Sequence, residues 1–470
     1  MQFDVDDLAR RLRAQLVGAS EDGQRSRAPL TVDGLAIDSR LVSHGQMFAA
    51  IRGGRDGHDF VEAAFAAGAA AVLVERVPLG GAAGPSLVVT SVPDALADLA
   101  RVARDRLSSH GAGVDRVVDR VVGVTGSVGK TTTKDLLAAV LGRRFSTAAS
   151  EKSFNNELGV PLTLVNAPDG TEAAVIEMGA RGAGHIRALC EMARPTVGVI
   201  TVVEGVHTEV MGTIEQIAAA KRELVEHLPA DGAAVLNADD PNVAAMAAHT
   251  VAAVVTFGSD GEVHAGDIAV DDELRPSFVL HSAWGSAAVR LGARGVHNVT
   301  NALAASAAGL WLGVEVEEVA SGLAEPPASP WRMELRRVPG GSVVLNDAYN
   351  AGPASMAAAL EALASLALPD GGRRIAVLGV MAELGSEGPG AHRRITELAE
   401  ELGVEVLAVG CDLYGASWSV GVTDDVATDD VVTEVTAALG DLGPGDAVLV
   451  KGSRVAGLER VAEALTRRDR

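Results

Sequence analysis

The stretch VVGVTGSVGKTTTKDLL, Val121–Leu137, decides the fold that we expect for this chain. It opens with an apolar run typical of a buried strand, turns at Gly126 and Gly129, and continues through Lys130 into an apolar-periodic helix. In such a loop the backbone N–H groups and the helix N-terminus face nucleotide phosphates, the lysine reaches the outer phosphates, and a threonine can bind magnesium. Val124 stands where the usual pattern has its first glycine, and an ordinary glycine-rich turn is the alternative interpretation. We predict that the chain binds ATP or a close relative.

The composition limits the number and class of domains and the kinds of partner that the chain can bind. A length of 470 residues predicts about three domains, and 48% hydrophobic with 3% aromatic content suits helices packed on parallel sheets. The formal net charge of −22 argues against a nucleic-acid-binding surface. Two cysteines form no disulfide framework, the N-terminus is acidic where a signal peptide would be basic, and no apolar run is long enough to span a membrane. We therefore expect a cytoplasmic protein that does not insert into membranes.

Two linker-like segments, which we call seams, divide the sequence. LSSHGAGVDR, from Leu107, is polar and contains glycine, and AEPPASP, ending at Pro330, holds three prolines that bar regular structure. The seams predict domains at residues 1–116, 117–328 and 329–470. Strand-like runs such as AAVIEM, TVGVITVV and AAVLNA, and later RRIAVLGV, VEVLAVG and DAVLVKGS, alternate with helical stretches. We predict an α/β fold: a central doubly wound parallel sheet with the phosphate loop, a C-terminal Rossmann-like domain, and a smaller N-terminal mixed α/β domain.

Two candidate metal ligands follow strands of the central sheet. Glu177 ends AAVIE, and a carboxylate at the carboxyl end of a strand beside the phosphate loop is well placed to bind magnesium. The alternative is a solvated loop glutamate. His207 follows VGVITVV in the same topological position, where a lone histidine is more often structural than a ligand.

Lys221 is an anomaly in the predicted helix TIEQIAAAKRELVEHL. The apolar stripe of this helix passes Ile217 and Ala218 and then reaches Lys221 itself. Arg222 and Glu223 are predicted to point toward solvent. A lysine on the core face must snorkel, pair with an acid or lose its charge, because an unpaired buried ammonium is costly. A neutral amine can react with carbon dioxide to give a carbamate, which is a carboxylate-like metal ligand.

Polar clusters also stand at loops and helix starts further along the chain. GVHNVTNALAA puts Asn298 and Asn301 on one face of a helix start, where the amides could read a base edge or merely cap the helix. The loops after the proline seam and after the last strand carry Arg332, Asp347, Tyr349, Asn350, Lys451, Ser453 and Arg454. The last three form either an anion pocket or an ordinary basic helix start.

Together these motifs resemble the Mur ligases, the ATP-dependent amide-forming enzymes of peptidoglycan synthesis. The resemblance spans nearly the whole chain, with the markers in the family's order: TGSVGKTTTK, EMG, the His207 loop, AAAKREL, NADD, GVHNVTNALAA, WRMEL and KGSR. Within the family, IDSR, DGHDF, SFNNELGVPLTL, DAYNAGPASM and MAELG resemble the branch that adds D-alanyl-D-alanine to UDP-N-acetylmuramoyl-tripeptide. The sequence lacks the Asp-Asn-Pro-Arg run usual in the sister ligase for a diamino acid.

The resemblance implies a role for each residue in catalysis and ATP binding. The ATP phosphates would be held by Gly126, Ser127, Val128, Gly129, Lys130, Thr131 and Thr132. One magnesium would be bound by Thr131 and Glu177, and a second would be served by His207 and a carbamylated Lys221. Adenine would lie near Asn298 and Asn301, with Arg332 and Asp347 at the ribose and phosphates. The implied catalytic residues are Lys130, Glu177, His207, Lys221 and Arg332.

The resemblance also implies where the other substrates bind. The UDP-sugar would be held by Ser39, Arg40, His58, Asp59 and Phe60. Asn155 and Asn156 would line the path to the peptide, and the remaining substrate contacts would come from Tyr349, Asn350, Lys451, Ser453 and Arg454. Two positions depart from the family pattern: Val380 stands where aspartate is common and Gly352 where asparagine is frequent. Both lie in the C-terminal domain near the implied dipeptide site.

The implied reaction passes the γ-phosphoryl group of ATP to the tripeptide carboxylate, after which the dipeptide amine attacks the acyl phosphate. We expect a monomer whose C-terminal domain closes onto ATP and brings Arg332 into place. Three alternatives remain open: a sister ligase with another acceptor, a nucleotide-binding scaffold without catalysis, and a small-molecule kinase.

Overall fold

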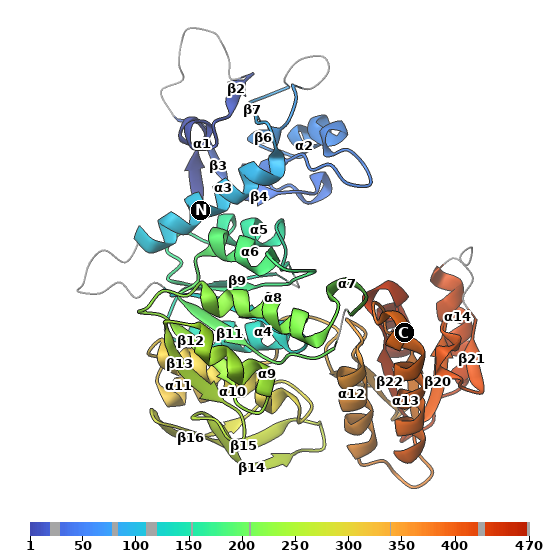
Figure 1. Cartoon of the computed structure of the whole chain (residues 1–470). Helices are drawn as coiled ribbons and strands as arrows, with labels where there is room; N and C mark the ends of the chain where they lie inside the picture. Colours follow the sequence, from blue (N-terminus) through green and yellow to red (C-terminus); the bar gives the residue numbers. More distant parts are fainter. Residues whose placement is uncertain are drawn as a thin grey trace.

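The computed structural model of the chain describes residues 1–18, 29–77, 83–109, 120–151, 154–205, 208–338, 340–421 and 428–467. Three groups of helices and strands follow one another in chain order, and Figure 1 shows the second group between the other two. This arrangement confirms the predicted three-part α/β fold. No helix in the described ranges is both long enough and apolar enough to cross a lipid bilayer.

The central group is built on a six-stranded parallel sheet in the order β13-β12-β11-β8-β10-β9. Its strands are β8 (Arg120–Thr125), β9 (Thr147–Ala149), β10 (Ala173–Glu177), β11 (Val197–Ile200), β12 (Ala233–Asn237) and β13 (Ala253–Phe257). The chain reverses its direction of progress across the sheet at β8, which lies between β10 and β11. The loop after β8 therefore sits at the switch point, where α/β sheets bind their ligands.

Helices cover both faces of this sheet. The helices of the central group are α4 (Lys130–Leu141), α5 (Gly159–Val165), α6 (His185–Ala193), α7 (Thr208–Met211), α8 (Ile214–Glu226), α9 (Pro241–Ala244), α10 (Asn298–Trp311) and α11 (Val316–Leu323). Helices α4, α10 and α11 pack together, and α6 packs on α8. A three-stranded antiparallel sheet that we did not predict is formed by β14 (His264–Val270), β15 (Pro276–Ser282) and β16 (Gly285–Arg290).

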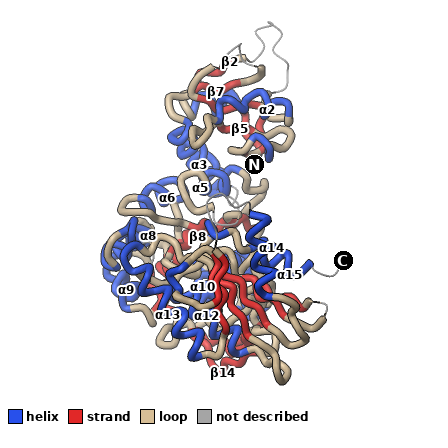
Figure 2. The backbone as a smooth tube through the Cα atoms, turned by 90° about the vertical axis from the view of Figure 1, so that its right-hand side faces the viewer, coloured by secondary structure: helices blue, strands red, loops and turns tan. Residues whose placement is uncertain are grey.

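The N-terminal group holds a five-stranded mixed sheet in the order β2-β7-β6-β5-β4 and a β1-β3 pair. Its elements are β1 (Gln2–Asp4), α1 (Val5–Arg11), β2 (Gln15–Val17), β3 (Thr31–Asp33), β4 (Leu35–Ala36), β5 (Met47–Ala49), α2 (Val61–Ala66), β6 (Ala71–Val74), β7 (Ser86–Val88) and α3 (Val92–Ser109). Helix α3 packs on α5 and α6, and Figure 2 shows it between the N-terminal sheet and α5.

The joint between the N-terminal and central groups is a continuous hydrophobic core. Phe3 and Leu96 from the first group share one buried cluster with Leu164 and Ile186 from the second. The buried guanidinium of Arg104 donates from Nε to the carbonyl of Ala193, 2.6 Å away, at the end of α6. These contacts make the two groups one packed body.

The C-terminal group is a second α/β unit with the sheet order β17-β18-β22-β19-β20-β21, parallel except for β17. Its elements are β17 (Glu334–Arg337), β18 (Val343–Asn346), α12 (Pro353–Ser365), β19 (Arg374–Leu378), α13 (Gly388–Glu401), β20 (Glu405–Val409), β21 (Trp418–Val420), α14 (Thr428–Leu439), β22 (Ala447–Lys451) and α15 (Glu459–Arg467). Short 3-10 turns are η1 (Ser39–Leu41), η2 (Gly57–Phe60), η3 (Ala245–His249), η4 (Gly385–Glu387), η5 (Asp412–Tyr414) and η6 (Arg454–Ala456).

The domain boundaries 1–116, 117–328 and 329–470 stay a proposal. The first boundary falls in residues 110–119, outside the described ranges.

Candidate active site

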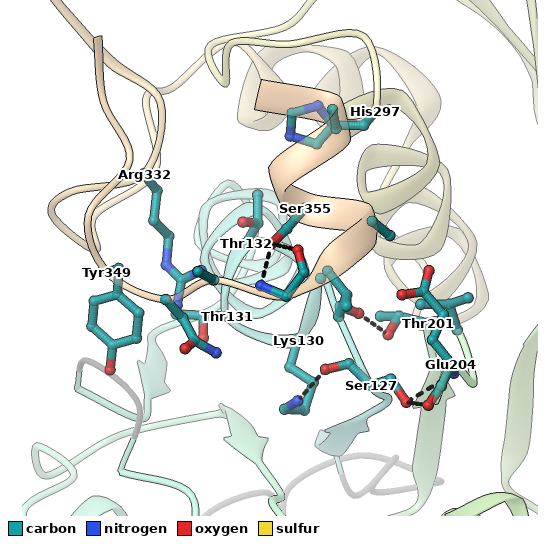
Figure 3. A pocket seen from close by; sticks show the side chains of 18 of the residues that line it. Ser127, Lys130, Thr131, Thr132, Thr201, Glu204, His297, Arg332, Tyr349 and Ser355 are labelled. Carbon is teal, nitrogen blue, oxygen red and sulfur yellow. Dashed lines mark hydrogen bonds between the residues drawn. The ribbon is translucent and has the colours of Figure 1, made fainter. Parts of the chain in front are cut away.

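A cavity of about 660 Å³ lies between the central and C-terminal groups. Its central wall comes from the phosphate loop, the carboxyl ends of β10, β11 and β12, and the start of α10. Its C-terminal wall comes from the loops that follow β18, β19 and β22. Figure 3 shows side chains from both walls, with Lys130 and Thr131 on one and Arg332 and Tyr349 on the other.

The phosphate loop needs glycine at two positions. Gly126 has φ +148°, and a Cβ there would lie 1.9 Å from Thr201 Oγ1. Gly129 has φ +87°, and a Cβ there would lie 2.3 Å from Asn301 Oδ1. Any other residue would be strained and would clash, so these glycines let the loop pass close to β11 and α10.

Lys130 begins α4, so the N-terminus of that helix opens into the cavity. Its ammonium donates to the carbonyls of Gly126 at 2.8 Å and Ser127 at 2.9 Å. Burial lowers the pKa of Lys130, the carboxylate of Glu177 opposes that shift, and the positive charge of Arg332 adds to it. The arrangement is a cationic, N–H-rich cradle suited to phosphate groups.

Glu177 presents one unused carboxylate oxygen near this cradle. The residue is buried, and its Oε1 accepts a 2.9 Å hydrogen bond from Nδ2 of Asn155. Its Oε2 is buried and has no hydrogen-bond partner in the described residues. Thr131 is buried on the same cavity wall. A carboxylate oxygen and a hydroxyl are hard donors of the kind magnesium prefers, so these residues fit the metal that the sequence suggested.

Lys221 lies on the buried face of α8, as its place in the apolar stripe predicts. Burial, together with the charge of Lys130, lowers the pKa of Lys221 to about 7. No carboxylate pairs with it in the part of the chain that the structure describes. A lysine on a buried helix face can snorkel, pair with an acid or lose its charge, and these surroundings favour loss of charge. His207, the other residue assigned to a second metal, lies outside the described residues.

The prediction that Glu223 faces solvent is wrong. Its carboxylate is buried and accepts the N–H groups of Gly184 at 2.6 Å and Arg187 at 2.9 Å. These donors belong to the first turn of α6, whose N–H groups have no partner within the helix. Glu223 therefore caps the neighbouring helix.

The amide of Asn301 joins α10 to the first turns of α4, the helix that follows the phosphate loop. Asn301 donates from Nδ2 to Oδ1 of Asn298 at 2.7 Å, and its own Oδ1 accepts from Thr133 at 3.3 Å. Asn298 also donates to the carbonyl of Arg294 at 2.6 Å. Both asparagines line the cavity, so the amides support the helix start and also face the nucleotide side.

Arg332 reaches the cavity from the segment that connects α11 to β17, between the second and third groups. Its guanidinium lies over the ring of Tyr349, 4.2 Å from the ring centroid, and its Nε has no hydrogen-bond partner among described atoms. The flanking residues Trp331 and Met333 have φ of +59° and +52°. These left-handed conformations are rare outside glycine, so the backbone that aims Arg332 is held by its surroundings.

Asp347 and Lys451, assigned separately to ATP and substrate, form an ion pair in which the lysine is buried and the carboxylate is partly buried. Oδ1 of Asp347 accepts the N–H of Met333 at 3.0 Å. Lys451 also donates to the carbonyl of Asn350 at 3.0 Å. The structure brings Asp347, Asn350 and Lys451 together at the cavity wall.

The loop after β22 supplies the other predicted C-terminal residues. Arg454 stacks on Trp331 at 4.5 Å and pairs with Glu459 at 2.6 Å. Ser453 accepts the N–H of Ala382 at 2.9 Å. Both Ser453 and Arg454 line the cavity. Gly352, one of the two departures from the family pattern, lines it as well, whereas the other, Val380, is partly buried against the C-terminal core.

The proposed UDP-sugar residues lie in the N-terminal group, away from this cavity. Arg40 pairs with Asp38 at 2.6 Å, and the adjacent Ser39 begins η1. The buried ring of His58 bonds Asp56 through Nδ1 at 2.6 Å, and its Nε2 accepts the N–H of Glu75 at 2.9 Å.

The neighbours of His58 are open to a ligand to different degrees. Asp59 is exposed, and Phe60 carries the guanidinium of Arg55 over its ring at 5.0 Å. Asn156 lies in the central group and caps α5, because its Oδ1 accepts the N–H groups of Leu158 and Gly159.

Sequence reasoning missed several cavity residues at strand ends. Thr201 donates to the carbonyl of Val128 at 2.5 Å, and Ser127 and Glu204 exchange two hydrogen bonds of 2.9 and 3.0 Å. Burial and the neighbouring Asp240 raise the pKa of Glu204. The rule that found Glu177, a polar residue at the carboxyl end of a central strand, would also have found Thr201 and Glu204. His297 on the nucleotide side was missed although it adjoins Asn298.

The geometry is that of a phosphate-loop enzyme with a nucleotide cradle on one domain and a cationic wall on another. Family models match three consecutive parts of the chain: "Mur ligase family, catalytic domain" at residues 31–104, "Mur ligase middle domain" at 124–309, and "Mur ligase, glutamate ligase domain" at 331–454. The chain belongs to the Mur ligase family.

Among curated relatives, the UDP-N-acetylmuramoyl-tripeptide–D-alanyl-D-alanine ligase of Mycobacterium tuberculosis is 42% identical over 97% of both chains. The enzyme of that name from Escherichia coli is 33% identical over 94% of this chain and 96% of its own. A solved structure of MurF from Acinetobacter baumannii aligns with a TM-score of 0.82 at 28% identity, covering 100% of this chain and 99% of that one. MurF from Thermotoga maritima in complex with ADP aligns at 0.74 and 30% identity, covering 93% of this chain and 97% of that one.

Proposed function

We propose that this chain joins D-alanyl-D-alanine to UDP-N-acetylmuramoyl-tripeptide and converts ATP to ADP and phosphate, in peptidoglycan precursor synthesis. The observation that carries the proposal is the cavity, where Lys130 and Glu177 of one domain face Arg332 of another. Identity of 42% to a ligase of this name along almost the whole chain supports the same acceptor.

In the first step the tripeptide carboxylate attacks the γ-phosphorus of ATP, which gives an acyl phosphate and ADP. The cradle of loop N–H groups and Lys130 would hold the phosphates and balance charge on the transferring group. Arg332 would add a second positive charge from the opposite wall. Asn155, which orients Glu177, would lie beside the incoming carboxylate.

In the second step the dipeptide amine attacks the acyl carbonyl, an amide forms, and phosphate leaves. Thr131 and Glu177 would hold one magnesium ion, and a carbamylated Lys221 with His207 a second. Such ions supply charge neutralisation at the phosphates when bound. The low pKa of Lys221 supports the carbamate, because only the neutral amine reacts with carbon dioxide.

The remaining assignments concern binding and assembly. The UDP-sugar would bind the N-terminal group near Ser39, Arg40 and His58–Phe60. We propose a cytoplasmic monomer, since a single chain supplies all of the cavity's described walls. Closure of the C-terminal domain would bring Arg332 to the phosphates; an unchanged scattering envelope with and without nucleotide and UDP-substrate would refute that movement.

The test is ADP release from ATP and magnesium with UDP-N-acetylmuramoyl-tripeptide, with and without D-alanyl-D-alanine, followed by product mass. Release that needs both substrates and a product heavier by one dipeptide are expected. Release with a diamino acid in place of the dipeptide would identify a sister ligase. A stable phosphorylated product without an amide would indicate a kinase, and no release with any amine would indicate a binding scaffold.

A further inference from the structure

The loop at residues 379–385 runs from the end of β19 to the first residue of η4 and is held at four consecutive backbone positions. The hydroxyl of Tyr414 donates to the carbonyl of Gly379 at 2.8 Å. The N–H of Ser453 donates to the carbonyl of Val380, and Oγ of Ser453 accepts the N–H of Ala382, both at 2.9 Å. The fourth contact comes from a histidine on α13.

That histidine is His392, which is fully buried. Its Nε2 accepts the N–H of Met381 at 2.9 Å, and its Nδ1 donates to the carbonyl of Gly388 at 2.7 Å. Because Nε2 accepts, the ring is neutral and carries its proton on Nδ1. The ring meets Tyr414 edge-on, with centroids 4.7 Å apart and an interplanar angle of 76°. His392 and Tyr414 form one buried brace beneath the loop.

The braced loop forms part of the cavity wall. Ala382, Glu383 and Leu384 line the cavity, and Glu383 has φ +63°, a conformation that needs outside support in a residue with a side chain. The next residue, Gly385, has φ +52°, and a Cβ there would come within 3.3 Å of Glu209 Cβ on α7 of the central group. The brace thus fixes both a cavity wall and a contact between domains.

The other walls of the cavity have proposed substrates, and the acceptor is the substrate left for this loop to contact. The phosphate loop and α10 take the nucleotide, and Glu177 with Asn155 faces the donor carboxylate. The wall that remains carries the carboxylate of Glu383 and the guanidinium of Arg454, which Glu459 holds at 2.6 Å, on two loops that Ser453 joins. A wall with charged groups of both signs suits a zwitterion, which is what a free dipeptide is at neutral pH.

We propose that His392 and Tyr414 are positioning residues that hold loop 379–385 as the acceptor wall, and so determine the affinity for the incoming amine. This inference rests on the proposed ligase function. It assigns no chemical step to either residue, because both are buried behind the loop and act through its backbone.

Three variants test the brace. His392→Leu removes the acceptor for the Met381 N–H, His392→Gln keeps an acceptor oxygen near the position of Nε2, and Tyr414→Phe removes only the bond to Gly379. Ile395→Ala is the matched control, because Ile395 is buried on the same helix and packs in the core without bonding the loop. Ile395→Ala measures how a loss of stability in the C-terminal domain alone affects the KM values and the amide exchange.

The measurements are KM for D-alanyl-D-alanine and for ATP, and hydrogen exchange at Met381 and Ala382. In His392→Leu we expect KM for the dipeptide to rise about tenfold, the effect of one lost buried hydrogen bond, with KM for ATP within about twofold. Amide exchange at the loop should accelerate, His392→Gln should restore most of both effects, and Ile395→Ala should change neither. Equal shifts in both KM values, or a loop equally protected in His392→Leu, would overturn the proposal.

Failure of the ligase assignment gives a different result. A wild-type chain that releases no ADP with the dipeptide refutes the proposed function whatever the variants do. The brace is then still judged by exchange at Met381 and Ala382, and by KM for whichever amine supports ADP release.

Discussion

The ammonium of Lys451, at the end of β22, pairs with Oδ2 of Asp347, whose other oxygen accepts the N–H of Met333. The pair thereby connects the end of one strand to the backbone beside Arg332. The side chains of Lys451 and Asp347 are only 3% and 14% exposed, so solvation by water is too weak to stabilise either charge without its partner.

Replacing Lys451 by Met should therefore destabilise the C-terminal domain by about 3–5 kcal/mol, because it leaves the carboxylate of Asp347 buried and unpaired. Thermal and urea unfolding measure the loss. Adding Asp347→Leu should recover part of it, which a double-mutant cycle would show. Arg467→Met is the control, since its pair with Glu463 is exposed and should contribute under about 1 kcal/mol. Similar losses in the two single variants would contradict the prediction.

Gly126→Ala should abolish nucleotide binding. The new methyl group would overlap Thr201 Oγ1, and the φ of +148° disfavours any side chain, so the loop must move off its phosphate-binding path. Calorimetric titration with ADP measures the effect. Gly182→Ala is the matched control, because nothing lies within 4 Å of a Cβ there. Nucleotide affinity within threefold of wild type in Gly126→Ala would refute this account of the loop.

Lys221→Met should remove activity and raise the melting temperature of the ligand-free protein. The folded state lowers the pKa of Lys221 to about 7, while the unfolded chain keeps the ordinary value near 10.5. As the pH falls from about 11 to 7 the unfolded state takes up a proton that the folded state resists, so the wild type loses stability over that range. The gain in Lys221→Met should be largest at and below pH 7 and should vanish only above about pH 11.

Chemical rescue tests the carbamate separately. Lys221→Ala should be nearly inactive and should recover part of its activity with a short carboxylate such as acetate or formate, which can replace the carbamate oxygens. Full activity in Lys221→Ala without any addition would rule out the assignment.

His392 should make the protein acid-sensitive. Burial lowers the pKa of its imidazole, so below about pH 6.5 the unfolded chain binds a proton that the folded chain does not. Stability is then lost as the pH falls through the unfolded value, and the difference in melting temperature between wild type and His392→Gln should shrink from pH 8 to pH 5. A constant difference over that range would show that this histidine does not titrate on unfolding.

The sequence predicts what depends on local pattern. Apolar runs in parallel strands, glycines in the phosphate loop, and Glu177 at a strand end all follow from neighbours within a few positions. The pairing of Asp347 with Lys451 joins residues 104 positions apart and requires β18 and β22 to be adjacent, which no local pattern states. Glu223 was misplaced for the same reason, since its partners belong to another helix. The roles of Ser39, Arg40 and His58 stay predictions.

The shared core of the first two groups has a consequence for the donor substrate. Phe3 and Leu96 pack with Leu164 and Ile186, and the N-terminal amine of Met1 donates to the carbonyl of Ala167 at 2.8 Å. If the nucleotide end of the donor is held in the first domain as proposed, the shared core fixes the distance from that end to Lys130. This fixed distance selects donors whose peptide has the matching length. A peptide one residue too short would leave its carboxylate out of reach of the γ-phosphate, and a longer one would have to buckle.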